Sequence, residues 1–336
     1  MEIKLDQSYF QGAVSLEMKE DGIHPWRLPL QDLALYKSHD GLSHKLKEAA
    51  GVRIRFHTDS PFVELDVGWV EGEHLDALFD LVVDGDLTSS VCRGEERAPI
   101  RFENLSGALD QIQEIWLPVG GAIVLRSLKI EEGRSLTPVD DQRLRWVTYG
   151  SSISHCNGCA SPSRTWPAVC ARTHNLDLTC LGVAGQCHID SMIAMMIRDL
   201  PADVITLKLG INVYGRGSLN ARSFVPAVVG FVRIVREKHP NTPIGLITPI
   251  YSDNRETEAN HVAWTLENYR EALRSAYEVL RAHGDEHIFM FEGPELLSER
   301  EASLLPDNLH PNGEGYELMG TRAAQNVLPL LLNDRI

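Results

Sequence analysis

From residue 145 onward, the chain alternates short apolar runs with longer amphipathic stretches, and this alternation restricts the fold more than any other feature. A short apolar run bounded by turn residues is typical of a buried strand, and apolar residues repeated every three to four positions are typical of a helix. Strands that alternate with helices predict a parallel sheet covered on both faces. We expect strands at 146–149, 178–181, 204–207, 244–247 and 288–291, and helices at 164–174, 188–200, 221–238, 265–283 and 314–332. Residues 145–336 are therefore expected to form an α/β domain with a doubly wound, flavodoxin-like sheet of five parallel strands.

Residues 1–135 follow a different pattern, in which apolar and polar residues alternate. The alternation is clear over residues 52–70, and turn residues at 84–86 and 120–121 lie beside further apolar runs. Short strands at this spacing indicate an antiparallel β-sandwich or jelly roll, because a single sheet cannot bury its apolar face alone. Residues 136–144, which are polar and contain Pro138, are expected to link the two domains.

The net charge of −15 argues against binding to a nucleic-acid backbone or to an anionic membrane surface. No apolar run reaches the roughly 18 residues that a transmembrane helix needs. The first residues lack the apolar run of a secretory signal, so a cytoplasmic location is expected. The six cysteines would then be reduced.

Four turns that carry glycine or polar side chains belong to the α/β half of the sequence. They lie at 150–154, 182–186, 210–212 and 307–312. Turns at the carboxyl ends of parallel strands meet at one edge of the sheet, where ligands bind. Each turn alone is ordinary, since glycine is a common turn residue and serine a common helix cap. Together they would assemble a hydroxyl, an imidazole, a carboxylate and N–H donors, which are the parts of a serine acyl-transfer site.

These turns resemble the sequence blocks of the SGNH, or GDSL-type, hydrolase superfamily, and the resemblance covers about residues 145–330. Ser152 stands at the nucleophile position of Gly150-Ser151-Ser152. Gly185 and Asn212 match the oxyanion-hole glycine and asparagine. The carboxylate and imidazole positions of the Asp-x-x-His block match Asp307 and His310.

Two positions depart from the usual pattern of the superfamily. Ser151 stands where aspartate commonly precedes the nucleophile, and Val213 stands where aspartate commonly follows the asparagine. Neither position carries a catalytic group, so the departures indicate a divergent branch. The Gly-Ser-Ser-Ile form resembles a bacterial two-domain subgroup, in which a β-sandwich precedes the SGNH domain. That subgroup includes esterases, deacetylases and acyltransferases that act on small molecules.

The resemblance implies a role for each matched residue. Ser152 Oγ attacks an acyl carbonyl, His310 takes the serine proton, and Asp307 orients the imidazole. The oxyanion hole would consist of the backbone N–H groups of Ser152 and Gly185 and the side-chain amide of Asn212. No cofactor is implied. The Gly-x-Ser-x-Gly elbow of the α/β-hydrolases is absent around Ser152, which argues against that fold.

Several other residues are candidates for a function near these turns. A Cys/His-rich group comprises His155, Cys156, Cys159, Cys187 and His188. A zinc site normally needs a second Cys-x-x-Cys pair, so we expect no metal and assign the thiols to packing. His155 and His188 are expected to contact the substrate or neighbouring loops. The segment 251–264 follows the fourth strand of the α/β domain, and His261 and Trp264 are therefore candidates for substrate contact.

The sequence thus predicts a serine esterase or acylhydrolase that forms an acyl-enzyme at Ser152. The expected substrate is an ester in which a short acyl group, such as acetyl, is attached to a carbohydrate or small molecule. One alternative retains the acyl-enzyme but passes the acyl group to a small-molecule alcohol. Another is a binding protein on an inactive hydrolase scaffold, which the joint presence of all five matched residues disfavours. The role of the N-terminal domain and the oligomeric state stay open.

Overall fold

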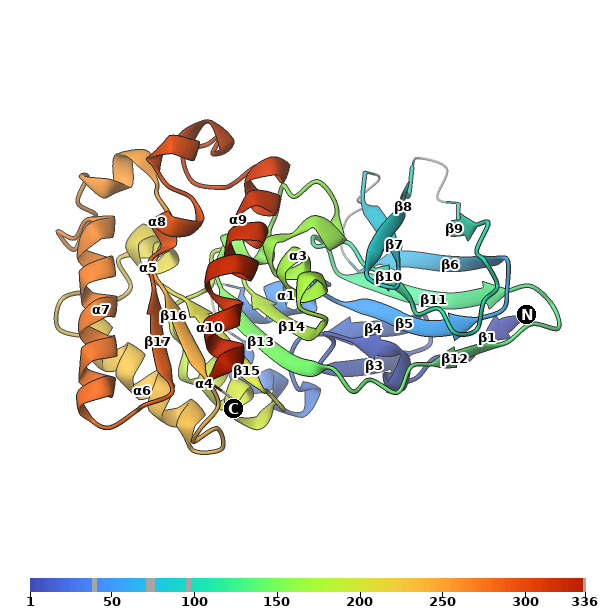
Figure 1. Ribbon diagram of the computed structural model, residues 1–336, viewed down its shortest axis with the longest axis horizontal. Helices are drawn as coiled ribbons and strands as arrows, with labels where there is room; N and C mark the ends of the chain where they lie inside the picture. The colour runs from blue at the N-terminus through green and yellow to red at the C-terminus, as the bar shows by residue number, and fades with distance from the viewer. Residues whose placement is uncertain (38–40, 71–75, 95–97, 335–336) are drawn as a thin grey trace. The chain divides into compact units, whose positions relative to one another are not determined.

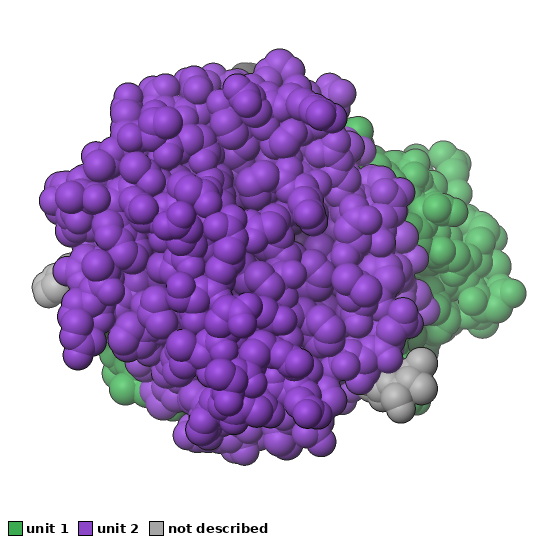
Figure 2. All heavy atoms as spheres, turned by 60° about the vertical axis from the view of Figure 1, so that its left-hand side comes forward, with its two compact units in different colours: residues 1–143, 161–164, 177–180 green, residues 144–160, 165–176, 181–336 purple. Residues whose placement is uncertain are grey.

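The computed structural model describes residues 1–37, 41–70, 76–94 and 98–334. The chain forms two compact units, which are coloured separately in Figure 2. The first unit comprises residues 1–143 together with the short segments 161–164 and 177–180. The second unit comprises residues 144–160, 165–176 and 181–336. Neither unit is therefore one continuous stretch of chain.

The first unit contains two antiparallel sheets, which confirms the predicted β-sandwich (Figure 1). One sheet has the strand order β3-β4-β11-β6-β9, with β1 paired to β11. Its strands are β1 (Glu2–Ile3), β3 (Ser15–Lys19), β4 (Gly22–Trp26), β6 (Phe62–Trp69), β9 (Ile100–Glu103) and β11 (Ile123–Ile130). The other sheet has the order β12-β5-β10-β7-β8, with β2 paired to β5. Its strands are β2 (Phe10–Gln11), β5 (Arg53–Thr58), β7 (Leu78–Val83), β8 (Asp86–Cys92), β10 (Gln113–Trp116) and β12 (Leu136–Pro138).

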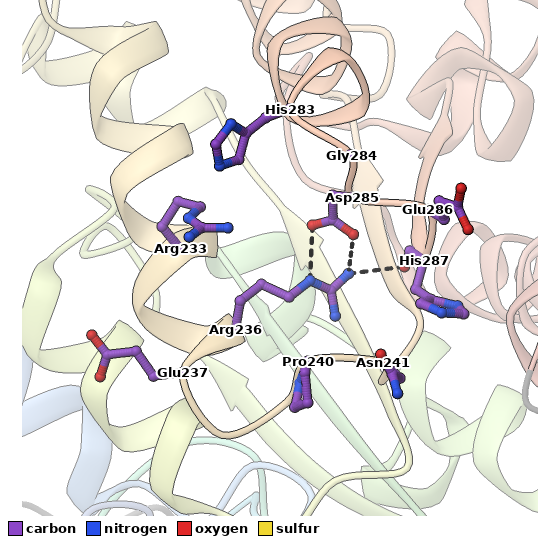
Figure 3. A pocket seen from close by; sticks show the side chains of 10 residues that line it. All are labelled: Arg233, Arg236, Glu237, Pro240, Asn241, His283, Gly284, Asp285, Glu286 and His287. Carbon is purple, nitrogen blue, oxygen red and sulfur yellow. Dashed lines mark hydrogen bonds and ion pairs between the residues drawn. The ribbon is translucent and has the colours of Figure 1, made fainter.

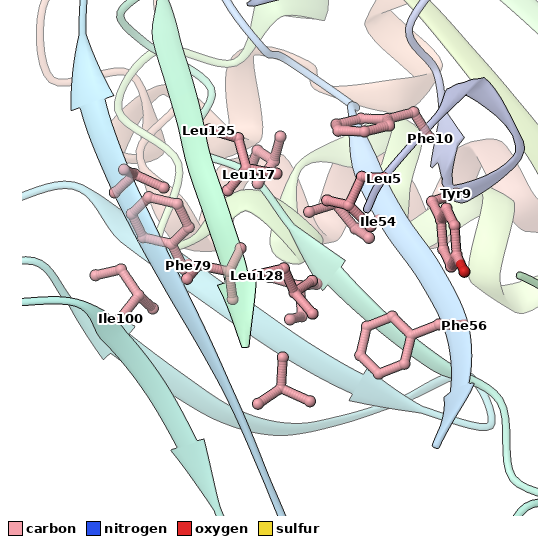
Figure 4. Close-up of a cluster of buried hydrophobic side chains, with 14 of the residues drawn as sticks. Leu5, Tyr9, Phe10, Ile54, Phe56, Phe79, Ile100, Leu117, Leu125 and Leu128 are labelled. Atoms are coloured by element: carbon pink, nitrogen blue, oxygen red, sulfur yellow. The ribbon is translucent and has the colours of Figure 1, made fainter. Parts of the chain in front are cut away.

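The apolar core of the first unit follows from the alternation seen in the sequence. On β6, Val63, Leu65 and Val67 are completely buried, whereas the residues between them are partly exposed. Ile54 and Phe56 of β5 join the same cluster from the other sheet (Figure 4). Burial of alternate side chains from two sheets supplies the main stabilising free energy of this unit.

Residues 136–138 form β12 and pair with β5, although the sequence analysis placed them in a linker. The pairing runs from Leu136 with Thr58 to Pro138 with Phe56. Proline cannot donate to a sheet ladder, and Pro138 lies at the edge of its sheet, where that loss is tolerated. The boundary between the two units falls between residues 143 and 144.

A buried carboxylate holds one of the short later segments within the first unit. The Asp80 side chain is completely buried on β7. Its Oδ2 accepts hydrogen bonds from Ser161 Oγ at 2.6 Å, Ser163 Oγ at 2.6 Å and Ser163 N at 2.8 Å. Its Oδ1 accepts from Ser90 Oγ at 2.6 Å. These four bonds satisfy a charge that would otherwise be costly to bury.

The second unit contains the predicted five-stranded sheet, with order β14-β13-β15-β16-β17. Its strands are β13 (Leu144–Gly150), β14 (Leu176–Gly182), β15 (Val204–Lys208), β16 (Ile244–Ile247) and β17 (Ile288–Phe291). Counted along the chain, the order is 2-1-3-4-5, the flavodoxin-like arrangement. The strand order reverses between β13 and β15, so a ligand is expected near the carboxyl ends of these two strands.

Helices cover both faces of this sheet. They are α2 (Ser152–His155), α3 (Trp166–Thr173), α4 (Ser191–Asp199), α5 (Ile211–Arg216), α6 (Phe224–Arg236), α7 (Leu266–Ala282), α8 (Gly293–Leu296), α9 (Gly313–Asn326) and α10 (Leu328–Asn333). Trp146 and Tyr149 point to opposite faces of β13, because they lie three positions apart. Trp146 packs against Trp166 of α3, and Tyr149 stacks on Phe231 of α6. Helices α3 and α6 therefore lie on opposite faces.

One short helix, α1 (Leu42–Lys47), lies in the first unit. None of the helices in the described ranges is both long and apolar enough to span a bilayer. The cytoplasmic location stays a prediction.

Candidate active site

Ser152 lies at the first position of α2, directly after β13. Ser151 caps this helix, and its side chain accepts a hydrogen bond from the Ile153 N–H at 3.2 Å. The sharp turn needs glycine at position 150, because a Cβ there would overlap the side chain of Ser154. Ser152 itself is 8% exposed, whereas its neighbours Ser151 and Ile153 are almost completely buried.

Ser152, His310 and Asp307 form one continuous chain of hydrogen bonds. Ser152 Oγ lies 2.8 Å from His310 Nε2, and His310 Nδ1 lies 2.6 Å from Asp307 Oδ2. A carboxylate can only accept, so Nδ1 carries the proton and Nε2 is left to accept from the serine hydroxyl. The structure thus brings together three residues that are up to 158 positions apart in the sequence.

Asp307 is held as an anion by its own loop. Its Oδ1 accepts from the N–H groups of Leu309 and His310, while its Oδ2 binds the imidazole. Burial acts to raise the pKa of Asp307, but the side-chain and backbone hydrogen bonds from His310 outweigh it and lower that pKa below its ordinary value. Asp307 therefore stays ionised and can orient the imidazole and balance its positive charge.

The Asn212 side chain is oriented by the backbone of the neighbouring loop. Its Oδ1 accepts a hydrogen bond from the Cys187 N–H at 3.1 Å. Since the amide oxygen is occupied, the Nδ2 group is the end that stays available as a donor. The backbone N–H groups of Ser152 and Gly185 also have no acceptor within the described part of the chain. Three donors are thus available, from the turns after β13, β14 and β15.

The loop that carries Gly185 is fixed from several sides. Gly185 has φ +71°, a backbone conformation that favours glycine. His188 Nε2 lies 3.2 Å from the Gly185 carbonyl oxygen, and His188 Nδ1 lies 2.8 Å from Ser218 Oγ. The carbonyl can only accept, so His188 donates through Nε2 and accepts the Ser218 hydroxyl proton at Nδ1. The sequence analysis expected His188 to contact the substrate or a neighbouring loop, and these two bonds are contacts of the second kind.

A second bracing contact holds the loop that carries His310. Ser252 is completely buried, and its Oγ donates to the Asn308 carbonyl oxygen at 2.6 Å. Arg255 Nη1 donates to the same carbonyl at 3.2 Å and to Ser252 Oγ at 3.1 Å. Asn308 has φ +60° and lies between Asp307 and His310. Neither Ser252 nor Arg255 has a sequence signal, because their acceptor is a backbone carbonyl more than fifty positions away.

His261 and Trp264, the two candidates for substrate contact, lie in different environments. His261 is exposed, and its ring packs against the position where Gly217 would carry a Cβ. Trp264 is half-buried and packs edge-on against Tyr269, with ring centroids 4.8 Å apart, and near Phe224 at 6.4 Å. This packing gives Trp264 a structural role, and contact of either side chain with a substrate stays a prediction.

The cysteines of the Cys/His-rich group are mostly enclosed. Cys156 ends α2 with φ +65° and is buried, whereas Cys159 is partly exposed. Burial raises the pKa of the Cys187 thiol to about 12. Within the ranges described, no three His, Cys, Asp or Glu side chains are placed as metal ligands would be. The absence of a metal stays a prediction.

Lys208, the last residue of β15, is a buried cation near these turns. It is 1% exposed, and its Nζ has no hydrogen-bond partner among the described residues. Desolvation lowers the pKa of Lys208 to about 7.

A cavity of about 350 Å³ lies elsewhere in the second unit and contains none of the candidate catalytic residues. Its lining residues come from the end of α6, from the segment directly after it and from the segment that precedes β17 (Figure 3). Arg236 is fixed there by Asp285 through two bonds of 2.8 and 2.9 Å, and it also donates to the His287 carbonyl. Because this arginine already has a carboxylate partner, we assign it to the stability of the strand ends.

Comparison with known proteins identifies both parts of the chain. Residues 144–330 match the model of the GDSL-like lipase/acylhydrolase family, and residues 8–126 match the SsfX3 N-terminal domain. None of the curated proteins compared with the chain matches it.

Three solved structures are similar over nearly the whole chain. The salicylyl-acyltransferase SsfX3 from a tetracycline biosynthetic pathway is 34% identical, with a TM-score of 0.87, and the match covers 97% of this chain and 95% of that one. A structure described as a GDSL-like lipase from Bacteroides ovatus ATCC 8483 is 20% identical, with a TM-score of 0.75 and the same coverage. A family two carbohydrate esterase from Cellvibrio japonicus is 12% identical, with a TM-score of 0.66, and the match covers 99% and 98% of the two chains.

The last two likenesses concern the fold alone, whereas the first extends to the sequence. The family model matches more than half of the chain and includes all five residues that the sequence analysis selected. The predicted resemblance and the prediction of an enzyme are thereby confirmed. This two-domain chain belongs to the GDSL-like lipase/acylhydrolase family, whose members hydrolyse or transfer acyl groups.

Proposed function

We propose that the chain transfers acyl groups through an acyl-enzyme formed on Ser152. The observation that carries this proposal is the unbroken chain from Ser152 Oγ through His310 to Asp307. His310 Nε2 takes the hydroxyl proton as Oγ attacks the ester carbonyl, and the protonated imidazole then gives that proton to the leaving alcohol. In the second half of the cycle, His310 deprotonates the acceptor, which attacks the acyl-serine and frees Oγ.

The negative charge on the tetrahedral intermediate needs donors that are already in position. The N–H groups of Ser152 and Gly185 and the Nδ2 group of Asn212 would fill this role. The bond from Cys187 N–H to Asn212 Oδ1 supports it, because it orients the amide before a substrate binds. One such donor is typically worth about 10²–10³ in kcat.

We propose a short acyl group, such as acetyl, on a carbohydrate or small molecule as the substrate, with water as the acceptor. A second candidate function is transfer of the acyl group to a small-molecule hydroxyl. It is favoured by one observation, the 34% identity to a salicylyl-acyltransferase over 97% of this chain. Both functions use the same acyl-enzyme, and they differ only in which nucleophile reaches the acyl-serine.

The test of the acyl-enzyme is hydrolysis of 4-nitrophenyl acetate, butyrate and octanoate by the parent protein and by Ser152→Ala. We expect turnover by the parent alone, with unchanged thermal unfolding of the variant. Labelling by a fluorophosphonate probe should likewise require Ser152. Equal activity of the two proteins, or failure of the parent both to turn over esters and to be labelled, would contradict the proposal.

The acceptor can be tested separately. With 4-nitrophenyl acetate as donor, the ratio of released nitrophenol to released acetate is measured as an alcohol is added. A ratio that stays at one supports hydrolysis, because water then receives every acyl group. A ratio that rises with alcohol concentration, together with recovery of the new ester, supports transfer.

A further inference from the structure

Arg255 places a positive charge beside the loop that carries His310. Its Nη1 lies 3.2 Å from the Asn308 carbonyl oxygen, and Asn308 is two residues before His310. The residue belongs to a short 3₁₀ turn, Asp253–Glu256, in the segment that follows β16. This position is on the same loop edge of the sheet as the turn after β15.

The Arg255 guanidinium has N–H groups that are not used in hydrogen bonds within the described residues. Arg255 makes two hydrogen bonds within the described residues, and both come from Nη1. Its Nε and Nη2 groups have no acceptor there, and no carboxylate of the described residues forms an ion pair with Arg255. By contrast, Arg270 and Arg274 of α7 are both bound to Glu267. Arg255 is half-buried.

The acidic residues of the same turn are already engaged. Glu256 accepts from Arg270, whose Nη2 lies 2.8 Å from Glu256 Oε1. Asp253 accepts from the Tyr251 hydroxyl at 3.1 Å. Neither carboxylate is therefore the partner of Arg255.

The turn is also held rigidly. The Ser252 N–H donates to Glu256 Oε1 at 2.8 Å. Arg270 is 2% exposed and also donates to the Pro249 and Ile250 carbonyls, so it fixes the segment that leads into the turn. A fixed donor loses little conformational entropy when it binds a ligand.

Tyr214 connects the segment that carries Arg255 to the helix that contains Asn212. It lies two residues after Asn212 on α5, and its hydroxyl donates at 3.0 Å to the carbonyl of Glu258, which is three residues after Arg255. The segment around Arg255 is therefore bonded to α5 through Glu258 and to the loop that carries His310 through Asn308.

We propose that Arg255 binds a carboxylate of the substrate and so determines specificity. The unused Nε and Nη2 groups form the side-on fork that matches the two oxygens of a carboxylate. This inference deepens the proposed function, on which it rests. It assigns a negatively charged group to either the acyl half or the alcohol half of the substrate.

The experiment compares matched pairs of esters. One pair is monophenyl glutarate and its carboxamide isostere, in which the charge lies on the acyl half. The other pair is 3-acetoxybenzoate and 3-acetoxybenzamide, in which it lies on the alcohol half. We expect the parent to prefer the anion of one pair in kcat/KM, and that pair identifies the charged half. Arg255→Gln should reduce the preference by about 10- to 100-fold, the range for charge-assisted hydrogen bonds, and Arg255→Lys should retain part of it.

Ser252→Ala is the matched control, because it removes the serine's hydrogen bonds to Asn308 and Arg255 but leaves the charge of Arg255 and its own bond to Asn308 in place. It should lower the rates for both members of a pair alike and leave their ratio unchanged. If the parent shows no preference in either pair, or if Arg255→Gln leaves the preference intact, Arg255 only braces the loop and the inference is wrong.

A binding measurement separates this inference from the acyl-enzyme proposal. Calorimetry with the Ser152→Ala protein needs no turnover, so it reports on Arg255 even if the chain proves to be inactive. Tighter binding of the preferred anionic ester than of its carboxamide, lost in Ser152→Ala/Arg255→Gln, would support the inference. Equal binding of the two would overturn it.

Discussion

At the scale of single residues, the candidate site is organised by which donors and acceptors are already occupied. Asn212 uses its oxygen on the Cys187 N–H, and His310 uses Nδ1 on Asp307. In Asn212 this bond leaves Nδ2 as a free donor, and in His310 it leaves Nε2 as an acceptor. A prediction for Asn212 and one for Asp307 rest on these assignments.

Asn212→Ala removes the proposed side-chain donor and should lower kcat by about 10²–10³. The Tm should change little, since Asn212 is only partly buried. Asn212→Asp is a sharper variant, because it retains the acceptor for Cys187 but presents a negative charge to the oxyanion, and it should be the slower of the two. Steady-state kinetics and thermal unfolding check this, and an unchanged kcat in Asn212→Ala would remove the residue from the oxyanion hole.

Asp307→Asn should lower kcat by about 10⁴, because an amide can stabilise the wrong imidazole tautomer. In the parent, protonation of Asp307 should not limit kcat/KM until a lower pH than for an ordinary aspartate, because its pKa is lowered. The check is steady-state kinetics of both proteins, with a pH profile of kcat/KM for the parent. An Asp307→Asn variant with the kcat of the parent would contradict the assignment.

At the scale of elements, the loop after β14 has to keep the Gly185 N–H in position before a substrate binds. His188 anchors it through the Gly185 carbonyl and Ser218. His188→Ala should lower kcat about tenfold with little change in KM, because roughly one hydrogen bond of positioning free energy is lost. His188→Gln can still donate to the carbonyl and should recover part of the rate. A loss confined to KM would indicate direct substrate contact instead.

The elements that the sequence predicted best are those whose pattern is purely local. Ile244–Ile247 and Ile288–Phe291 were predicted with the bounds that the structure has, because each is a short apolar run between polar turns. The predicted closing helix is interrupted at Val327, and α10 begins one residue later with Pro329 near its start. Proline lacks the N–H that would continue the earlier helix.

The candidate site was predictable where a residue type or a family resemblance marks the position, as the resemblance does for Gly185 and Asn212. Ser152, Asp307 and His310 were found because their residue types and order suffice to suggest acyl transfer. Arg255 and Ser252 were missed, because both act on the backbone carbonyl of Asn308, which any residue would supply. For His188, the sequence left contact with the substrate or with a neighbouring loop open, because one of its partners is the backbone carbonyl of Gly185.

At the scale of the whole molecule, Lys208 affects the free energy of unfolding. Burial lowers the pKa of its side chain to about 7, below that of a lysine in an unfolded chain. The unfolded chain therefore binds more protons above pH 7, and stability should rise with pH until the unfolded lysine also loses its proton.

Lys208→Met removes this buried amine and should increase the free energy of unfolding at neutral pH by about 2–4 kcal/mol. The advantage of the variant should shrink as the pH approaches 10. Urea unfolding of both proteins at several pH values measures it. A variant that is less stable than the parent at pH 7 would show that Lys208 has a stabilising partner.

The interleaved course of the chain limits how the two units can be exchanged among relatives. The matches to the two family models suggest a single domain boundary, since one match ends at residue 126 and the other begins at residue 144. The first unit, however, also includes 161–164 and 177–180, and Asp80 depends on Ser161 and Ser163 for its hydrogen bonds. A hybrid joined at residue 143 would therefore bring a foreign partner to Asp80. A hybrid of two relatives should therefore fold only when the segment that carries both serines is exchanged together with residues 1–143.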